Sequence, residues 1–396
     1  MERALEGIRV LEFARFVAGP YCTTHLADMG AEVIKVERPG GADDRAFYPP
    51  SPDGESFSFK ALTRNKKGIT LNVRSERGKE ILNELVKQAD VVFHNFPQGT
   101  TEARVLDYDL LSQVNPQIIV AALTAWGTDG PYARRVGFDS IVQAESAIMG
   151  FTGFPGNPPT KAQVPFIDLG TGLHAALGIV VALFHRQRTG MGQMVDVSLL
   201  DTAVSFGIGL GPAAERKILG IERPQVGNYS YQAFGGCFRA KDGWVSLSPA
   251  SDTLWERFIK AIGRGDLADD PRFETTIGRF ENRGLIGSML EEWLAERTVD
   301  EAIRVLEEAR VPCGRVKNVL EAMDDPQVKA RGMLIYQEYP MLGEVPVSPT
   351  PIKFSRTPVR VDSPRPLVGE HNEEVYPRLL GYSLEELSQL KEEGVI

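Results

Sequence analysis

The chain has 396 residues, which is long enough for two or three domains that each bury a hydrophobic core. Hydrophobic residues make up 42% and charged residues 24% of the sequence, as in an ordinary globular enzyme. The formal net charge is −9, so the surface as a whole repels polyanions and we expect no nucleic-acid partner.

The three cysteines, Cys22, Cys237 and Cys313, lie far apart and form no CxxC pair. Their spacing argues against a disulfide framework or a structural zinc site and favours a reducing compartment. The first residues lack the basic flank and long apolar core of a signal peptide. The apolar stretch around Leu173–Leu183 is too short to span a bilayer. We therefore expect a cytoplasmic protein without a membrane role.

The first part of the chain alternates between short β-branched runs and helical periodicity. Four runs are typical of buried strands: Ile8–Phe13, Ala31–Glu37, Asp90–Asn95 and Gln117–Leu123. Residues Ser75–Ala89 carry a single apolar stripe behind a serine N-cap, as in an amphipathic helix. Strands that alternate with helices predict an α/β fold with an open, mostly parallel, Rossmann-like sheet.

The rest of the chain predicts a second, smaller domain. A long helix is expected from about Asp168 to Arg188, and a strand at Met194–Leu200. From Arg223 the sequence is turn-rich and aromatic, with a hairpin signal at Asp242–Gly243. Amphipathic helices are expected at Asp252–Ile262, Asn282–Ala295, Val299–Ala309 and, after an N-cap at Ser383, Leu384–Glu393.

These elements predict four segments. Residues 1–205 form the N-terminal part of a large α/β domain, and residues 206–224 form a linker. Residues 225–325 form a small α+β domain. Residues 326–396 contain a linker and a C-terminal return to the large domain, because they lack enough periodic structure for a core of their own.

The usual nucleotide and metal motifs are absent from the sequence. The Walker pattern GxxxxGK(S/T) does not occur, and GxGxxG does not follow the first strand. HExxH and GxSxG are also missing, and none of the five histidines is paired at metal-ligand spacing. We therefore expect no metal and no permanently bound cofactor.

Eight blocks of sequence, in order along nearly the whole chain, carry a resemblance to one family. They are LEGIRVLEFARFVAGP (5–20), LADMGAEVIKVERPGGADD (26–44), NKKGITLNVRSERGKEIL (65–82), ADVVFHNFPQG (89–99), GTDGPYARRVGFDSIVQA (127–144), the segment 168–201 that begins DLGTG, KDGWVSLS (241–248) and GEHNEEVY (369–376). In these blocks the chain resembles the class III CoA-transferases, the CaiB/BaiF family of formyl-CoA:oxalate and carnitine CoA-transferases. The resemblance implies transfer of CoA from an acyl-CoA donor to a small carboxylic acid, with CoA thioesters as substrates.

The resemblance implies that Asp168 is the nucleophile, because the family places an aspartate at a helix start before a turn that here contains Thr171 and Gly172. A carboxylate with an unperturbed pKa of about 3.9 is ionised at pH 7 and can attack a thioester without a general base. The expected intermediates are an acyl-aspartyl anhydride and then an aspartyl-CoA thioester. Backbone N–H groups at the helix start could stabilise the oxyanions. The alternative role for Asp168 is a helix N-cap.

The same resemblance implies where CoA binds. Contacts are expected along the loops after the first strands, at Val17, Ala18, Arg38, Leu71, Asn72, Val73, Arg74, Asn95, Phe96, Pro97 and Arg104. The guanidinium groups of Arg38 and Arg104 could stack on adenine or pair with phosphates. For any single arginine the alternative is a solvated surface charge. Val17 stands where formyl-CoA transferase has a glutamine, which argues against oxalate as the acceptor.

Two further segments are expected near the reacting centre. Gly137, Phe138 and Asp139 match the family's aromatic and acidic pair, where Asp139 positions the acceptor acid or Asp168, or caps a helix. A second segment falls where the family has a mobile glycine loop over the active site: Phe234, Gly235 and Gly236. This segment is either a lid that excludes water from the intermediates or a tight turn.

Three other functions compete with CoA transfer. An α-methylacyl-CoA racemase shares the fold and CoA site, but such racemases carry a histidine where this chain has Phe138, and phenylalanine cannot exchange protons. A dinucleotide-dependent dehydrogenase would lack its phosphate fingerprint. A silent acyl-CoA-binding protein would leave Asp168 idle. The resemblance also implies an interlocked homodimer. It does not identify the donor and acceptor acids.

Overall fold

The computed structural model describes residues 3–396. These residues form two compact units, each of which is described by itself. The large unit takes in the chain up to Ile148, Ala162–Ile221 and Gln327–Ile396, and the small unit consists of Met149–Lys161 and Glu222–Pro326.

A six-stranded parallel sheet forms the centre of the large unit, in the order β3-β2-β1-β4-β5-β6. Its strands are β1 (Arg9–Glu12), β2 (Glu32–Glu37), β3 (Lys66–Thr70), β4 (Val91–His94), β5 (Ile119–Thr124) and β6 (Met194–Ser198). The predicted α/β fold with an open parallel sheet is confirmed. β3 was not expected because it begins with two lysines. Lys66 is nevertheless buried, since its Nζ lies 2.8 Å from the carboxylate of Glu12.

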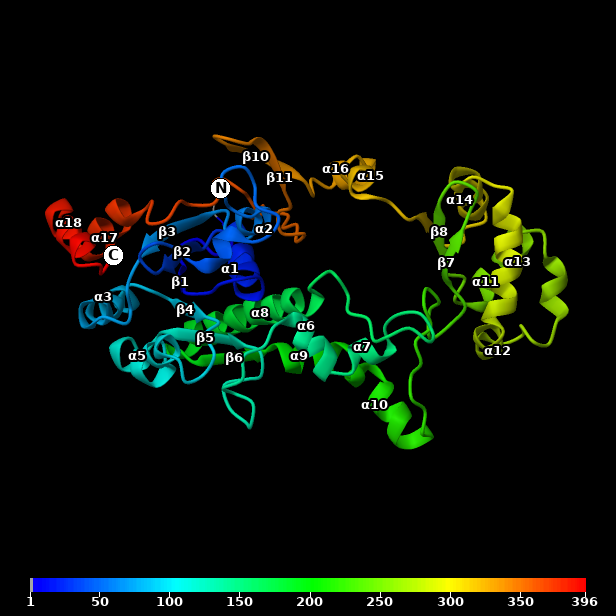
Figure 1. The fold of residues 1–396 in the computed structure, drawn as a ribbon, viewed down its shortest axis with the longest axis horizontal. Helices are drawn as coiled ribbons and strands as arrows, with labels where there is room; N and C mark the ends of the chain where they lie inside the picture. The colour runs from blue at the N-terminus through cyan, green and yellow to red at the C-terminus, as the bar shows by residue number, and fades with distance from the viewer. Residues whose placement is uncertain (1–2) are drawn as a thin grey trace. The chain divides into compact units, whose positions relative to one another are not determined.

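Helices cover both faces of this sheet (Figure 1). On one face α1 (Ala18–Asp28) packs against α8 (Phe166–Thr189). A Cβ at Gly172 would lie 2.6 Å from the carbonyl oxygen of Ala18, so only glycine permits this close approach. On the other face α3 (Glu76–Lys87) and α5 (Tyr108–Val114) bury apolar side chains in one core. The expected N-cap of α3 is confirmed, because Ser75 accepts a hydrogen bond from the Gly78 N–H.

The remaining helical segments of the large unit are short. They are η1 (Asp43–Ala46), α2 (Phe57–Leu62), α4 (Thr101–Val105), α6 (Asp139–Glu145), α9 (Leu199–Phe206), η2 (Ile208–Leu210), α10 (Pro212–Ala214) and η3 (Glu215–Leu219). The last three lie in the segment that was expected to be a linker. Two more, α7 (Ile148–Phe151) and α16 (Pro326–Ala330), lie where the chain passes from one unit to the other.

Helix α8 has 24 residues and is, by length and composition alone, apolar enough to cross a membrane. The stretch that the sequence singles out, Leu173–Leu183, is too short to span a bilayer. The helix extends beyond these residues at both ends, so its length alone would suffice. Three features are those of a core helix: α8 packs against α1, α9, β5 and β6, its residues Ile179, Ala182 and Leu183 are buried, and its first turn contains Asp168.

The C-terminal segment completes the large unit. β10 (Ile335–Tyr339) and β11 (Gly343–Val347) form an antiparallel pair. α17 (Asn372–Leu380) and α18 (Leu384–Glu392) bury Val375, Tyr376, Leu387 and Leu390 in the same core as α3. Ser383 caps α18, as expected. The return is anchored by the buried carboxylate of Asp28, which accepts hydrogen bonds from Arg64 and from the backbone of Thr350.

The small unit has its own antiparallel sheet and core. Its strands are β7 (Gly236–Arg239), β8 (Trp244–Leu247) and β9 (Cys313–Arg315), and the expected hairpin at Asp242–Gly243 joins the first two. Its helices are α11 (Asp252–Ala261), η4 (Gly265–Asp269), α12 (Thr276–Glu281), α13 (Arg283–Ala295), α14 (Val299–Glu308) and α15 (Val319–Met323). Residues 149–161 belong to this unit and not to the N-terminal segment, because Gly227 and Gln225 donate hydrogen bonds to the carbonyl groups of Gly153 and Thr152.

Candidate active site

The loop after β1 lies at the carboxyl edge of the parallel sheet, where open α/β sheets bind their ligands. Asn95 holds this loop from the end of β4: Arg15 N donates to Asn95 Oδ1 at 3.0 Å, and Asn95 Nδ2 donates to the Arg15 carbonyl at 2.7 Å. Phe16 N donates to Asp44 Oδ2 at 2.8 Å. These contacts keep Phe16 at a φ of 70°, a left-handed conformation that is rare for a bulky residue. The loop is therefore held in one strained shape.

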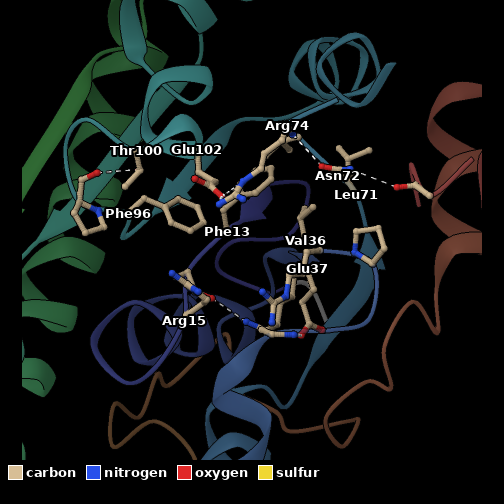
Figure 2. Close-up of a pocket in the computed structure, with 18 residues that line it drawn as sticks. Phe13, Arg15, Val36, Glu37, Leu71, Asn72, Arg74, Phe96, Thr100 and Glu102 are labelled. Atoms are coloured by element: carbon tan, nitrogen blue, oxygen red, sulfur yellow. Dashed lines mark hydrogen bonds and ion pairs between the residues drawn. The ribbon is translucent and has the colours of Figure 1, made fainter. Parts of the chain in front are cut away.

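A cavity of about 490 Å³ lies beside this loop (Figure 2). It is lined by many of the residues that were expected to bind CoA: Arg38, Leu71, Asn72, Val73, Arg74, Phe96 and Pro97. The guanidinium group of Arg74 pairs with Glu102 at 2.6 Å, and that of Arg38 pairs with Asp43. Both guanidinium groups are mostly exposed, so these pairs are weak and either arginine can turn to a phosphate at little cost.

A second cavity, of about 350 Å³, is continuous in its lining with the first. Arg15, Pro97 and Thr100 line both cavities. The other predicted residues that line the second cavity are Val17, Ala18, Asn95, Gly137, Phe138 and Asp168. The two cavities are therefore neighbours, and the second contains the carboxyl group of Asp168.

Asp168 is held in the first turn of α8 by a second aspartate. The Oδ2 atom of Asp139, in the first turn of α6, accepts hydrogen bonds from the backbone N–H groups of Ile167 at 2.9 Å and Asp168 at 3.2 Å. Asp139 is buried and lies outside both cavity linings. The N-cap position of α8 is Pro165, so Asp168 is not the cap. This geometry favours the expectation that Asp139 positions Asp168.

The same contacts change the expectation for oxyanion stabilisation. The first N–H groups of α8 already have acceptors, because Asp139 takes two and the Pro165 carbonyl accepts the N–H of Leu169. They are therefore not free to hold an oxyanion in this conformation.

Burial, and secondly the charge of Asp139, raise the pKa of Asp168 to about 7. The expectation that Asp168 is fully ionised at pH 7 is therefore wrong, because it assumed an unperturbed carboxyl group. Asp168 therefore titrates near neutral pH. A strongly shifted carboxyl group in a cavity is typical of a catalytic position.

Some predicted residues lie outside the two cavities. Arg104 is exposed on α4, and Glu102, two residues earlier, lines the first cavity. Residues two apart on a helix point in different directions, so one helix does not present both to the same cavity. The contact of Arg104 with CoA stays a prediction.

The predicted glycine loop has clear roles within its own unit. Phe234 is buried in the core of the small unit against Phe238 and Phe258, and Gly236 is the first residue of β7. Gly235 accepts a hydrogen bond from the N–H of Ser230 through its carbonyl oxygen. A role as a lid over the active site stays a prediction.

The sequence did not single out two arginines that line the second cavity, Arg15 and Arg135. Arg15 lies in the segment FARF and Arg135 in YARRV, and both segments belong to blocks that carry the family resemblance. The only local sign of a binding role was a cation among apolar residues. Within residues 3–396 no group of three or more His, Cys, Asp or Glu side chains could hold a metal ion.

Comparisons with known proteins identify the family. The family model of CoA-transferase family III matches residues 5–372. The chain belongs to this family. It is similar to the succinyl-CoA–D-citramalate CoA-transferase of Chloroflexus aurantiacus, with 36% identity over 397 residues, 100% of this chain and 98% of that protein. The formyl-CoA:oxalate CoA-transferase of Streptomyces avermitilis is 36% identical over 418 residues, which cover 100% of both chains.

A solved structure agrees with these matches. The CAIB/BAIF family protein from Brucella suis has a TM-score of 0.84 and 35% identity to this chain, and the match covers 96% of this chain and 100% of that one. The resemblance read from the sequence is thus confirmed, and the chain is a class III CoA-transferase. The racemase alternative is not favoured.

Proposed function

We propose that this class III CoA-transferase moves CoA from an acyl-CoA donor to a small carboxylic acid through a thioester on Asp168. The observation that carries the proposal is the position of Asp168: its carboxyl group lines a cavity that shares Arg15, Pro97 and Thr100 with a larger, partly basic cavity.

The larger cavity suits the nucleotide end of CoA. Arg38 and Arg74 line it with largely exposed guanidinium groups and provide positive charge for phosphate groups. Phe13 and Phe96 line it too and offer apolar ring faces to an adenine base. The pantetheine arm then runs past Arg15 and brings the thioester to Asp168.

The reaction needs no net proton transfer. An Asp168 oxygen attacks the donor thioester carbonyl, the C–S bond breaks, and an acyl-aspartyl anhydride and CoA thiolate result. The thiolate attacks the aspartyl carbonyl of the anhydride, which releases the first acid and leaves CoA on Asp168. The acceptor carboxylate then attacks this thioester, which gives a second anhydride and CoA thiolate. The thiolate attacks the acceptor's carbonyl, forms the new acyl-CoA and restores the Asp168 carboxylate.

Asp139 has two effects on this nucleophile. Its hydrogen bonds to the start of α8 fix the position of Asp168, and its charge raises the pKa of the Asp168 carboxyl group. A carboxylate with a raised pKa is a better nucleophile, although a smaller fraction of it is ionised at pH 7. The fixed position and the raised pKa of Asp168 thus both favour its attack on a carbonyl group.

The competing racemase reaction predicts a different isotope result. Phe138 lines the cavity beside Asp168, and its ring has no titratable group. We therefore expect no enzyme-dependent deuterium uptake when a 2-methylacyl-CoA is incubated with the protein in deuterated water. With an added carboxylic acid, mass spectrometry should show new acyl-CoA species, and a panel of acids identifies the acceptor. Deuterium uptake at catalytic rates would favour the racemase and contradict this proposal.

We also propose that the chain forms a homodimer. Leu177, Val181 and Phe184 lie three and four residues apart on α8, and each side chain is more than half exposed. Residues at this spacing form one apolar face of a helix, which a single chain leaves uncovered.

Light scattering should therefore give about twice the chain mass of 43.6 kDa at micromolar concentration. Val181→Glu should shift the protein toward monomer or aggregate, because a buried unpaired charge opposes association. The matched change Gln113→Glu adds the same charge to the exposed side of α5, on the other face of the sheet, and should leave the mass unchanged. A stable monomer of the unchanged protein contradicts the proposal.

A further inference from the structure

A buried ionic cluster lies next to the loop after β1. It consists of the carboxylate of Glu12 at the end of β1 and the ammonium groups of Lys35 on β2 and Lys66 on β3, and none of the three residues is more than 2% exposed. Glu12 Oε2 lies 2.8 Å from Lys66 Nζ, and Glu12 Oε1 lies 3.6 Å from Lys35 Nζ. Among the described residues, Glu12 is the one carboxylate that forms an ion pair with either ammonium group. Such sharing is costly, because a buried charge is stable only when it is paired and hydrogen-bonded.

Each ammonium group also holds a backbone carbonyl group at one end of this loop. Lys35 Nζ donates to the Ala14 carbonyl oxygen at 2.9 Å, and Lys66 Nζ donates to the Pro20 carbonyl oxygen at 3.1 Å. Residues 15–18, which lie between these two points, line the second cavity, and Ala14 lines the first. The two buried lysines therefore fix both ends of a segment that forms part of the wall of both cavities.

The loop needs such anchors because its backbone is strained. Phe16, in the middle of the loop, has a φ of 70°. The two ends approach closely, since a Cβ at Gly19 would lie 2.5 Å from the Cβ of Ala14. A strained conformation persists only where the surrounding contacts determine it. Hydrogen bonds from charged donors are roughly twice as strong as those from neutral donors, which gives the two ammonium groups a role in this loop.

We propose that Lys35 and Lys66 are positioning residues for CoA binding, because their ammonium groups fix the loop after β1 and thereby the lining of both cavities. The inference rests on the proposed function, since it takes this loop as part of the CoA site. Loss of one ammonium group should weaken the binding of CoA thioesters. The nucleophile should keep its position, because Asp139 holds the backbone of Asp168 through separate contacts. The effect should therefore appear in KM and hardly in kcat.

The dependence of binding on pH tests this role without any substitution. Burial lowers the pKa of Lys66 to about 8, while the carboxylate of Glu12 opposes this shift and the charge of Lys35 adds to it. The ammonium group is therefore present well below pH 8 and is lost as the pH rises through about 8. The other titratable groups that interact with Lys66 are Cys22 and His25 on α1. Burial raises the pKa of the Cys22 thiol and lowers that of His25 to about 4, so neither changes its charge between about pH 7.5 and 9.5.

The experiment measures binding of acetyl-CoA by calorimetry in the Asp168→Ala protein, where neither transfer nor the titration of Asp168 contributes. Acetyl-CoA is the probe because it has no free thiol. Its Kd should rise about five- to tenfold between about pH 7.5 and 9.5. Adding Lys66→Met, which removes the ammonium group and keeps an apolar stem, should raise Kd about tenfold at pH 7.5 and abolish most of the alkaline rise. With Asp168 intact, Lys66→Met should raise KM about tenfold and leave kcat within about threefold.

The matched control is Lys67→Met. Lys67 is the next residue on β3, so its side chain leaves the opposite face of the strand, where it is partly exposed and pairs with Glu32 and Glu374. It lines neither cavity and loses the same charge on substitution. This variant should keep both the affinity at pH 7.5 and the alkaline rise in Kd. Circular dichroism at each pH checks that the proteins are folded.

The outcomes separate this inference from the proposed function. If acetyl-CoA binding depends on pH and on Lys66 as expected but the unchanged protein transfers no CoA, the inference stands and the proposed function fails. If CoA is transferred but Lys66→Met binds acetyl-CoA with unchanged affinity, or keeps the full alkaline rise in Kd, the inference is overturned and the proposed function stands. If Lys66→Met does not fold, the pH series on Asp168→Ala decides, and a constant Kd overturns the inference.

Discussion

Replacing Asp168 with alanine is expected to lower CoA transfer by at least about a thousandfold, because the variant has no carboxylate to carry the acyl group or CoA. The protein should stay folded, since Asp168 donates only its backbone N–H to Asp139 and alanine retains that group. When an acyl-CoA donor is added without acceptor and quenched in acid, intact-protein mass spectrometry should show a gain of CoA less one water. Fragmentation should locate this gain on Asp168.

The matched control for this result is Asp109→Ala. Asp109 also lies in the first turn of a helix, α5, but is exposed and lines neither cavity. This variant should keep both the adduct and turnover, whereas Asp168→Ala should lose both. Transfer by Asp168→Ala at a rate near that of the unchanged protein would show that another group is the nucleophile.

The pH dependence of kcat/KM should report the raised pKa of Asp168. The nucleophile is the ionised form, so kcat/KM should fall about tenfold per pH unit below about 7 and level off above it. Between the plateau above pH 8 and pH 5 the loss approaches a hundredfold, and about fiftyfold of it falls between pH 7 and pH 5. Substrate acids are ionised above about pH 5, so this limb belongs to the enzyme.

The variant Asp139→Asn tests whether the charge of Asp139 contributes to the raised pKa of Asp168. The amide oxygen of asparagine can still accept the N–H groups of Ile167 and Asp168, but the negative charge that raises the pKa of Asp168 is gone. The acid limb should therefore move to lower pH, although not to the value of an exposed carboxyl group, because burial is the larger cause. An acid limb centred near pH 4 in the unchanged protein would show that the pKa of Asp168 is not raised.

Much of the fold could be predicted from the sequence because its signals are local. β1, β2, β4 and β5 are short β-branched runs, and Ser75 and Ser383 are N-caps followed by apolar stripes. β3 was missed for the same reason: two lysines begin it, and only the distant carboxylate of Glu12 makes the burial of Lys66 possible. A sequence window contains no information about that partner.

The family resemblance extended this prediction to the site. It indicated seven of the eighteen residues that line the first cavity, and it led to Asp168 and Phe138 in the second. It did so because the loops at the carboxyl edge of a parallel sheet contribute runs of contiguous residues to the cavity, such as Leu71–Arg74. A short sequence block therefore identifies several lining residues at once. It did not indicate which way the side chains on α4 point.

The sequence by itself therefore determined the parallel sheet, the small domain and the aspartate at the start of a long helix. The tertiary structure alone decided the chemical state of that aspartate and the charges around it. The charge of Asp139 acts on Asp168 from a different helix, and Arg135 reaches the same cavity from a loop. Burial and the distance between charges set pKa and affinity, and both depend on residues that only folding brings together.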